Sequence, residues 1–442
     1  MARGKKAAKE LSPEEKLQQA LVPAEEQPYL IPENWCWVKL HFVCEYLKAG
    51  GDKPASFVEK KDKEHLIPVV ANGIENEGII GFTNIGQISA GTVSVSGRGT
   101  IGYSFLREYE YVPVVRLIVI KPRKNLLPDY LKFIFDVFEE KGTGSSIPQL
   151  TVPMIKDKII PLPPLPEQLR IVSRIESLFA KLDEAKEKAQ AVVDGFELRK
   201  SAILHKAFTG ELTEWWRKEH GVGMDGWKNT TLSEIVSGFK YGTSEKSTYN
   251  NTGMPVLRIP NVGTGTLSFE DMKYLAHNDV DEANQVHEND LLIIRSNGSR
   301  DLVGKCAIVP ALSRKFAYAS FLIRIKPSEW ILPDYLTLYL NSTDARTQMF
   351  KKAKSSAGIH NINSQELGSI TINVPTIYEQ SAIIAVLNNL LAKGQQAKEA
   401  AEAVLIQIDT MKKAILARAF RGELGTNDPA EESAEKLIKA VL

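Results

Sequence analysis

The sequence predicts an α+β protein in which two repeated mixed α/β domains are joined by two long helices that form an antiparallel coiled coil. Three observations support this fold class: a sustained heptad pattern, a second copy of that pattern, and motifs that recur in the region before each copy. From Ile171 to Phe196 the apolar residues alternate steps of four and three, which is the spacing of a coiled-coil seam. The same spacing returns from Ile383 to Ile415, and the offset from Ile171 to Ile383 is 212 residues.

The two seams should face each other, because a lone amphipathic helix would leave its apolar stripe in water. An antiparallel pair of about 40 residues each would separate the two domains by roughly 60 Å, at about 1.5 Å per residue. The alternative is that each helix merely closes the domain that precedes it. The predicted seam residues are Ile171, Ile175, Leu178, Leu182, Val192 and Phe196 in the first helix, and Ile383, Leu387, Leu390, Val404, Ile408, Met411 and Ile415 in the second.

Length and composition are those of a globular protein of two or three domains, because 442 residues exceed what one hydrophobic core usually organises. Lys and Arg total 55 against 54 Asp and Glu, which argues against a histone-like nucleic-acid binder but allows local basic surfaces. The three cysteines form no CxxC pair and no zinc spacing, and the first residues lack a signal-peptide pattern. No apolar run reaches the roughly 18 residues of a membrane span. These features indicate a cytoplasmic protein without a membrane partner.

Changes in composition along the chain define the expected boundaries. Residues 1–28 are rich in Lys and Glu and should form a charged N-terminal arm. Prolines, tryptophans and alternating apolar residues begin at Pro28, and a proline cluster, PLPPLPEQ, leads into the first long helix. The other expected segments are a first domain at 29–165, the first long helix with its connector at 166–225, a second domain at 226–375, the second long helix at 376–425 and a C-terminal tail at 426–442.

Short apolar runs between turn residues predict strands, and each domain should also carry one amphipathic helix. Both of these helices begin at the proline of an LPDYL motif, because proline is favoured at the first helical position. Thr376 and Glu379 fit a capping box at the start of the second long helix, whereas Gly195 weakens the first. The expected strands cover residues 67–70, 92–95 and 114–120 in the first domain, and 255–259, 291–295 and 321–325 in the second.

The two domains are diverged copies of one another. Trp35 and Trp227 begin matching stretches 192 residues apart, and the two LPDYL motifs are 205 residues apart. From Glu167 and Glu379 to the helix ends AFTGEL and AFRGEL the offset stays at 212. The globular parts therefore differ by insertions, while the helices keep one length. Variable domains on a spacer of fixed length are what a ruler between two recognition sites requires.

Catalytic and metal-binding motifs are absent from the sequence. It contains no HExxH, no GxSxG, no GxGxxG after a strand, and no Asn/Asp-Pro-Pro-Tyr/Phe tetrad of the amino-methyltransferases. The histidines are scattered without metal-ligand spacing. The sequence therefore predicts neither a catalytic centre nor a metal site.

From about Pro28 to Leu424 the chain resembles the specificity subunit of type I DNA restriction–modification systems. The resemblance depends on the paired LPDYL helices, the DLLIIRSNGS and VGK elements within 290–305, the PLPPLPEQ helix entry, and the helix ends AFTGELTEWWR and AFRGEL. It implies two target-recognition domains, each reading one half of a bipartite double-stranded DNA site. The paired helices would then fix the gap between the two halves.

The resemblance also implies partners. A subunit of this kind is not itself an enzyme; it recruits two methyltransferase subunits, which bind S-adenosylmethionine. In the full complex it also works with two restriction subunits, which translocate DNA and use ATP and magnesium. This chain should therefore bind no cofactor of its own. Its near-neutral charge departs from that of a solitary DNA binder, and is tolerable where partner subunits supply phosphate contacts.

Base edges are read mainly by Arg, Lys, Asn and Gln, with smaller contributions from Ser and Thr. Three loops in each domain offer such side chains next to the ends of predicted strands. Asn297 followed by Gly298 also fits a plain hairpin turn, and the Ser/Gly loops also fit ordinary surface connections. The candidate DNA-binding residues are Asn72, Ser96, Arg98, Thr143, Ser145, Ser146 and Gln149 in the first domain, and Arg258, Asn261, Arg295, Asn297, Ser299, Ser355, Ser356, His360 and Asn361 in the second.

Two alternatives to a DNA-recognition subunit stay open. A coiled-coil adaptor could use its paired domains to bind protein ligands, and then no DNA sequence would be selected even with partners present. A nuclease or methyltransferase of an unusual kind is the other alternative, which the missing motifs disfavour.

Overall fold

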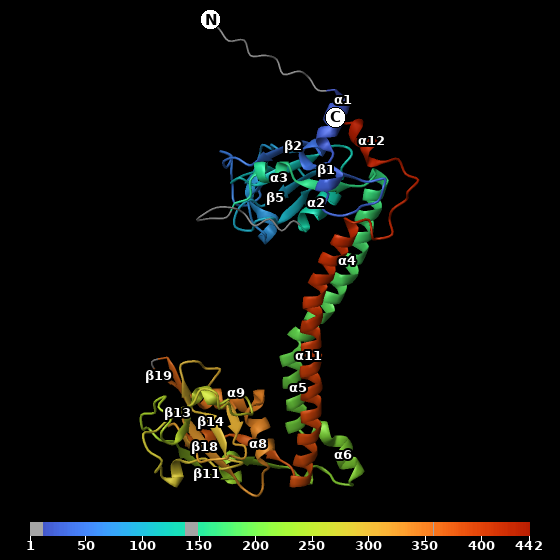
Figure 1. Ribbon diagram of the computed structural model, residues 1–442. Helices are drawn as coiled ribbons and strands as arrows, with labels where there is room; N and C mark the ends of the chain where they lie inside the picture. The colour runs from blue at the N-terminus through green and yellow to red at the C-terminus, as the bar shows by residue number, and fades with distance from the viewer. Residues whose placement is uncertain (1–11, 138–148, 357) are drawn as a thin grey trace. The chain divides into compact units, whose positions relative to one another are not determined.

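The computed structural model describes residues 12–137, 149–356 and 358–442, with residues 354–356 described by their backbone alone. The chain forms two compact units. Unit 1 comprises Met1–Ala189 and Ala403–Leu442, and unit 2 comprises Gln190–Glu402. Each unit therefore contains one globular domain together with part of both long helical stretches (Figure 1).

Among the described residues, the globular domain of unit 1 contains three sheets. A four-stranded antiparallel sheet has the order β2-β8-β5-β6, a three-stranded sheet has the order β4-β3-β7, and β1 pairs with β9. Helix α2 (Pro128–Asp136) packs on the four-stranded sheet and buries Val93 and Ile120 beneath it. The strands are β1 (Cys36–Lys39), β2 (Cys44–Ala49), β3 (Ile67–Val70), β4 (Ile79–Thr83), β5 (Thr92–Val95), β6 (Ser104–Arg107), β7 (Val112–Pro113), β8 (Ile118–Pro122) and β9 (Ile159–Leu162).

Unit 2 repeats this arrangement. Its sheets have the orders β11-β18-β14-β16, β13-β12-β17 and β10-β21, and α8 (Pro333–Leu340) occupies the place of α2. A further small sheet, β15-β20-β19, has no counterpart sheet among the described residues of unit 1. The strands are β10 (Lys228–Thr231), β11 (Val236–Tyr241), β12 (Pro255–Leu257), β13 (Lys273–Tyr274), β14 (Leu291–Ile294), β15 (Ser296–Asn297), β16 (Cys306–Ile308), β17 (Ala317–Tyr318), β18 (Leu322–Pro327), β19 (Lys354–Ser356), β20 (Ile359–Asn361) and β21 (Thr371–Val374).

Strand register shows how closely the copies agree. Cys36 lies opposite Leu162 in unit 1, and Lys228 lies opposite Val374 in unit 2. Strands β2 and β11 also carry an irregularity at the same place relative to their partners β8 and β18. The internal repeat predicted from the motifs is therefore a repeat of strand pairing as well.

Three helices make up the two long helical stretches: α4 (Leu165–Asp194), α5 (Phe196–Phe208) and α11 (Ile377–Ala419). α4 and α5 meet at Gly195, which has φ −78° and ψ −4°. The Gly195 N–H still donates to the Ala191 carbonyl, and its own carbonyl accepts from the Arg199 N–H, each at 3.1 Å. The predicted weakness at Gly195 is thus a local irregularity through which helical hydrogen bonding continues.

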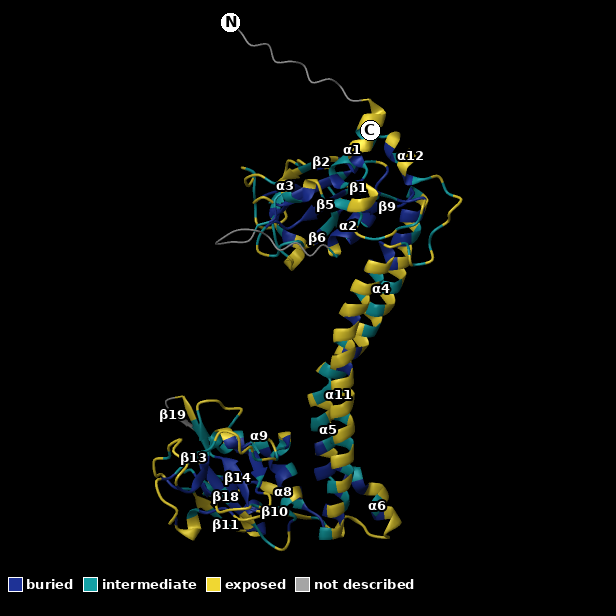
Figure 2. Ribbon diagram, viewed as in Figure 1, coloured by how far each residue is buried: buried dark blue, intermediate teal, exposed yellow. Residues whose placement is uncertain are grey.

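The long helices pair within each unit, and they pair antiparallel as predicted. In unit 1, Asp183 of α4 contacts Lys412 of α11 at 2.5 Å, and Lys186 contacts Asp409 at 3.7 Å, so rising numbers in one helix meet falling numbers in the other. In unit 2 the Phe196 ring of α5 lies against Gly394 of α11. The outward faces of these helices are exposed (Figure 2). The alternative that each helix closes a domain also has support, because Ile171 belongs to the core of unit 1 and Ile383 to that of unit 2.

The seam of α11 differs from the predicted one at two positions. Val404 and Met411 are 38% and 48% exposed, whereas Leu405 and Lys412 lie beside the buried Ile408 on the paired face. Lys412 places its ammonium 4.9 Å from the centre of the Phe179 ring and pairs with Asp183, so a lysine stem covers an apolar surface there. The other predicted seam residues are buried or half-buried: Ile171, Ile175, Leu178, Leu182, Val192, Phe196, Ile383, Leu387, Leu390, Ile408 and Ile415.

Two segments expected to be a loose arm and a tail are packed in unit 1. Helix α1 (Pro13–Ala20) is capped by Ser12, and α12 (Ala434–Lys439) pairs with it through Lys439 and Glu14 at 2.7 Å. Ala20 and Ile438 are completely buried in the core. Their polar composition did not predict this packing, which depends on a few apolar residues in each segment. Residues 1–11 of the predicted arm lie outside the described residues.

The strand predicted at 114–120 is interrupted. Val115 and Arg116 have φ of +53° and +63°, so β7 ends at Pro113 and β8 begins only at Ile118. Their N–H groups donate to the Gly51 and Gly50 carbonyls, which pulls the chain out of the strand. The shorter helices are α3 (Val152–Lys156), α6 (Glu214–Glu219), α7 (Leu232–Ile235), α9 (Thr343–Lys352) and α10 (Ser364–Gly368). Among the described residues, no helix has both the length and the apolar character needed to cross a membrane.

Candidate nucleic-acid interface

Asn72 ties together two loops of unit 1. Its Nδ2 donates to the Val115 carbonyl and its Oδ1 accepts from the Gly97 N–H, both at 2.8 Å. Only glycine fits at position 97, because a Cβ there would lie 2.8 Å from the Leu150 carbonyl oxygen. Both polar groups of Asn72 are engaged, so this residue positions the loops. Ser96, the neighbour of Gly97, is 1% exposed and is not available to a ligand in this conformation.

These loops carry a cluster of two arginines, Arg98 and Arg116, around Gln149. The Arg98 Nε and Nη2 donate to Gln149 Oε1 at 3.1 and 2.8 Å, and the Arg116 Nη1 approaches the same oxygen at 3.5 Å. The backbones of Arg98 and Gln149 also form an antiparallel bridge. Two guanidinium groups therefore converge at one place, and each keeps donors that could bind a phosphate or a guanine edge. The sequence did not single out Arg116, because it was expected inside a strand.

In unit 2 the small sheet brings two predicted loops together. Ser296 lies opposite Asn361 and Asn297 opposite His360, which joins β15 to β20. Asn297 Oδ1 accepts from the Ser299 N–H at 2.7 Å. The side-chain oxygen of Asn297 therefore stabilises a turn, as one of the two interpretations predicted. Its Nδ2 makes no hydrogen bond within the described part of the chain. The same asparagine can therefore shape the turn and present an amide donor.

Arg295 carries an unpaired donor next to this sheet. Its guanidinium lies 4.7 Å from the centre of the Tyr241 ring, and Tyr241 is partly exposed. Arg295 Nε and Asn361 Oδ1 are both buried, and neither has a hydrogen-bond partner among the described residues. Buried polar atoms without partners are rare in folded proteins and need a reason. Both atoms are inaccessible to solvent in this conformation, so a ligand could bind them only if this part of unit 2 rearranged.

Arg258 and Asn261 brace a loop instead. Arg258 Nη2 pairs with the Asp271 carboxylate at 2.9 Å, and Asn261 is 1% exposed. The Asn261 Oδ1 accepts from the Arg258 N–H at 2.8 Å while its Nδ2 donates to the Ser268 carbonyl at 3.0 Å. The amide of Asn261 is thus committed within the fold, and a direct contact with DNA from this residue would require rearrangement.

Several candidates cannot be placed at the level of side chains. Thr143, Ser145 and Ser146 lie outside the described residues. Ser355 and Ser356 belong to β19 and are described by their backbone alone, with Ser355 opposite His360 in the pairing.

A buried carboxylate anchors the start of each long helix. In unit 2, Glu379 Oε1 accepts from Arg217 Nη1 at 2.6 Å and from Thr213 Oγ1 at 2.7 Å, and Oε2 accepts from the Trp227 indole at 2.9 Å. The predicted capping box is therefore half formed: Thr376 Oγ1 accepts from the Glu379 N–H at 3.4 Å, but the carboxylate turns inward. A buried guanidinium and indole are stronger partners for it than a backbone N–H near solvent.

The counterpart in unit 1 is built differently. Glu167 accepts from the Trp35 indole at 2.7 Å and from Asn427 Nδ2 at 2.8 Å. The nearby Arg170 is bound instead by Glu431, at 2.7 and 2.9 Å. Burial raises the pKa of Glu167, and the hydrogen bond from Trp35 opposes this effect. The two anchors share a tryptophan and a glutamate, but the arginine occurs only in the anchor of unit 2 among the described residues.

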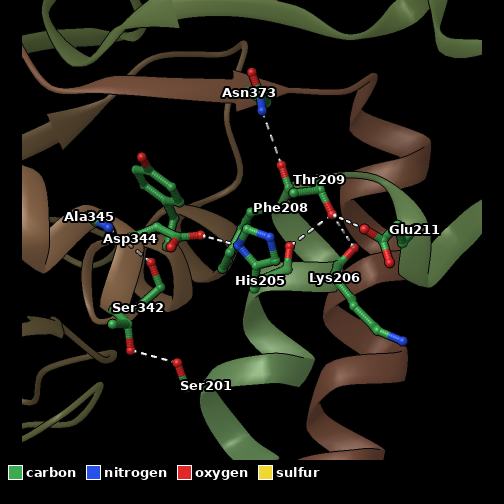
Figure 3. A network of polar contacts seen from close by, with 12 residues as sticks. Ser201, His205, Lys206, Phe208, Thr209, Glu211, Ser342, Asp344, Ala345 and Asn373 are labelled. Carbon is green, nitrogen blue, oxygen red and sulfur yellow. Dashed lines mark hydrogen bonds and ion pairs between the residues drawn. The ribbon is translucent and has the colours of Figure 1, made fainter.

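A second set of polar contacts fastens α5 to the domain of unit 2 (Figure 3). His205 Nδ1 and Asp344 Oδ2 are 2.8 Å apart, and Ser201 shares a hydrogen bond of 2.8 Å with Thr343. Asn373 Nδ2 of β21 donates to the Phe208 carbonyl at 3.2 Å. These contacts hold the helix on α9 and β21, so that the orientation of the domain on its helix is fixed locally.

Among the described residues, no group of His, Cys, Asp and Glu side chains is arranged to hold a metal ion. Burial raises the pKa of the Cys36 and Cys44 thiols to about 12, which makes both unreactive at neutral pH.

Comparison with known proteins gives one family. The model of the type I restriction modification DNA specificity domain matches residues 32–193 and again residues 224–403. The chain is 29% identical over 277 residues to the type I restriction enzyme EcoKI specificity subunit of Escherichia coli K12, which covers 62% of this chain and 59% of the relative. It is 26% identical over 328 residues to the StySPI specificity subunit of Salmonella potsdam, covering 71% of this chain and 69% of the relative.

Solved structures share the fold. A chain from a structure of the assembly of a type I R-M system superposes with a TM-score of 0.64 at 19% identity, over 90% of this chain and 100% of the other. The HsdS subunit from Thermoanaerobacter tengcongensis gives a TM-score of 0.61 at 20% identity, over the same shares of the two chains.

Proposed function

The chain belongs to the family of the type I restriction modification DNA specificity domain, which it contains twice, and from this premise we propose that it is the DNA-recognition subunit of such a complex. Each globular domain reads one half of a bipartite site in double-stranded DNA. The duplicated domain on paired helical stretches, α4 and α5 against α11, is the observation that carries the proposal. The relatives named above are specificity subunits of restriction enzymes, which agrees with it.

The proposed contacts differ between the two domains. In unit 1, the guanidinium groups of Arg98 and Arg116 beside Gln149 supply donors for a guanine edge or a phosphate. In unit 2, the half-buried guanidinium of Arg295 beside the small sheet and the amide Nδ2 of Asn297 supply the donors. Because the two sets are chemically different, the two half-sites should differ in sequence.

In this proposal the long helices set the distance between the two half-sites. α11 has 43 residues, which corresponds to about 65 Å at about 1.5 Å per residue. Anchors at Glu167 and Glu379 tie the start of each helix to its own domain, so that a change in helix length is transmitted to the spacing of the two readers. The proposed partners are two methyltransferase subunits and two restriction subunits, and the chain itself contributes recognition without catalysis.

The experiment is reconstitution with a type I methyltransferase subunit from the same host. We expect sequence-specific methylation in the presence of S-adenosylmethionine, with two half-sites and a constant gap read out by methylome sequencing. The chain alone should neither methylate nor cut DNA. Methylation by the chain alone, or a reconstituted complex that selects no sequence, would contradict the proposal; the second outcome would favour a protein-binding adaptor.

Arg98→Ala tests the assignment of a reader within this experiment. Methylation should lose preference at one half-site and keep the other, because the two domains are separate units. Arg314→Ala provides the control, since Arg314 is an exposed arginine of unit 2 that stacks on Tyr274 outside the loops discussed above.

A further inference from the structure

Strands β1 and β10 are counterparts, but their outer edges differ. In unit 1 the outer edge of β1 is occupied: Leu21 lies opposite Val38, and the Val22 N–H donates to the Trp37 carbonyl at 3.1 Å. In unit 2 no residue of the described chain pairs with the outer edge of β10, whose one strand partner is β21. An unpaired strand edge is a template for adding another strand.

The face beside β1 is covered by two short helices. α1 and α12 lie on it, and Ala20 and Ile438 are completely buried there. Leu17, Leu21 and Leu442 pack against the same core. Two polar contacts close the cover: Lys16 Nζ reaches the Leu442 carbonyl at 3.2 Å, and Arg123 Nη1 reaches the Val441 carbonyl at 3.4 Å.

Unit 2 has no such cover among its described residues, and a groove lies at the corresponding place. Its chain passes from α5 through α6 to β10 without counterparts of α1 and α12. The groove has a volume of about 530 Å³. Its walls include Lys228, Thr230, Ile235, Trp330, Val374 and Tyr378. Thr230, which is half-buried, corresponds to Val38, which is completely buried in unit 1, whereas Ile235 is buried in the groove as its counterpart Val43 is in unit 1.

The groove also exposes two large aromatic side chains. Trp330 is 66% exposed and Tyr378 is 81% exposed. Aromatic side chains left open beside an apolar cleft are typical of the anchors of a protein interface. The small sheet with β19, which holds the candidate DNA contacts, lies on the far side of unit 2 from the start of α11 (Figure 1). The groove wall contains one ammonium, of Lys228, and one carboxylate, of Glu234, so it offers no excess of positive charge to a nucleic-acid backbone.

We propose that this groove binds a segment of a partner protein with the chemistry of Ser12–Val22 of unit 1. That segment is a short amphipathic helix that presents leucines to the groove and ends in an extended residue. The N–H of the extended residue adds to the free edge of β10, as Val22 adds to β1. This docking site is independent of DNA reading and of the proposed half-site contacts.

The probe is a fluorescent peptide of residues 12–23, SPEEKLQQALVP, titrated into the full chain and followed by anisotropy. We expect saturable binding that is at least tenfold weaker in the double variant Trp330→Ala/Tyr378→Ala. Both side chains are exposed, so the variant should fold, which circular dichroism and thermal unfolding check. Trp215→Ala is the matched control, because Trp215 is a 54% exposed tryptophan of unit 2 outside the groove wall.

Two altered peptides test the mode of binding. Replacing Leu17 and Leu21 by Asp should abolish binding, and N-methylation of Val22 should weaken it by removing the strand donor. Absence of saturable binding, or equal affinity for the double variant, would overturn the proposal. Displacement of the peptide by duplex DNA would overturn it in favour of nucleic acid. Self-association of the chain that the double variant abolishes would overturn it in favour of a second copy.

Discussion

The anchor in unit 2 makes a quantitative prediction, because its arginine and its carboxylate are both buried. The Arg217 and Glu379 side chains are 9% and 3% exposed and 2.6 Å apart. Glu379→Gln keeps the volume but removes the negative charge, so that a guanidinium stays buried without an anion. Breaking a buried ion pair from one side costs about 3–5 kcal/mol. At about 1.36 kcal/mol for each factor of ten, the equilibrium for opening the anchor should rise roughly a hundredfold to a few thousandfold.

Hydrogen exchange is the suitable assay, since a chain of two units does not unfold in one step. Peptides covering residues 209–227 and 375–385 should lose protection by that factor, while peptides of unit 1 should not change. The matched variant is Glu167→Gln, which removes a buried carboxylate bound by the Trp35 indole and leaves no buried arginine behind. Its effect in unit 1 should be smaller, because no uncompensated cation stays buried there.

A second variant isolates the charge. Arg217→Met in the Glu379→Gln background should restore most of the lost protection, because it removes the uncompensated cation. Equal and small effects of the two glutamine variants would refute the reasoning, as they would show that Arg217 finds solvent when its partner is lost.

Three further predictions concern distance, recognition and pH. Inserting one heptad next to Gly195 and another at the facing Gly394 should lengthen the gap between the two half-sites by about three base pairs, because seven residues add about 10.5 Å. Methylome sequencing measures this gap, and altered half-sites would instead mean that the helices read bases. Arg98→Ala should weaken binding of the reconstituted complex to its own site at least tenfold, and an unchanged affinity would remove this residue from the interface. Burial raises the pKa of Glu167 above 4.5, so the contribution of its protonated form to stability is fully present below pH 4.5 and is lost as the pH rises through the folded pKa. The free energy of opening unit 1, measured by hydrogen exchange between pH 4 and 7, should therefore fall with rising pH, and Glu167→Gln should remove this pH dependence. An unchanged pH dependence in the variant would exclude this carboxyl as its source.

The repeat and the starts of the LPDYL helices were accessible from the sequence because each depends on local signals. LPDYL begins a helix in both domains, since proline fixes the first turn and the following apolar residues face the sheet. The packing of α1 was not accessible, because Ala20 is buried by residues more than 400 positions away, such as Ile438. A polar segment with few apolar residues looks solvated until its distant partner is known.

The same limit applies to the helix seam and to the candidate interface. Lys412 lies on the face of α11 that packs against α4, where its side chain lies over Phe179. A search for apolar residues does not detect such a lysine. Asn72 and Asn261 were good candidates by residue type, yet their amides are committed to loops. Arg116 was missed because its left-handed backbone, which turns the residue out of a strand, depends on contacts with Gly50 and Gly51 from elsewhere in the chain.

Unit 1 is assembled from two separate stretches of the chain, and this has a consequence for folding during translation. Unit 2 is one continuous stretch, Gln190–Glu402, so it can fold as soon as that stretch has left the ribosome. Unit 1 needs Ala403–Leu442 as well, and its core contains Leu416, Phe420 and Ile438. The domain that is translated first is therefore completed last, against the usual order in which N-terminal domains fold first. A nascent chain that has released residues up to 402, with residues 403–442 still inside the ribosome, would carry a finished second domain and an open first one, which exposes apolar core surface to chaperones and proteases.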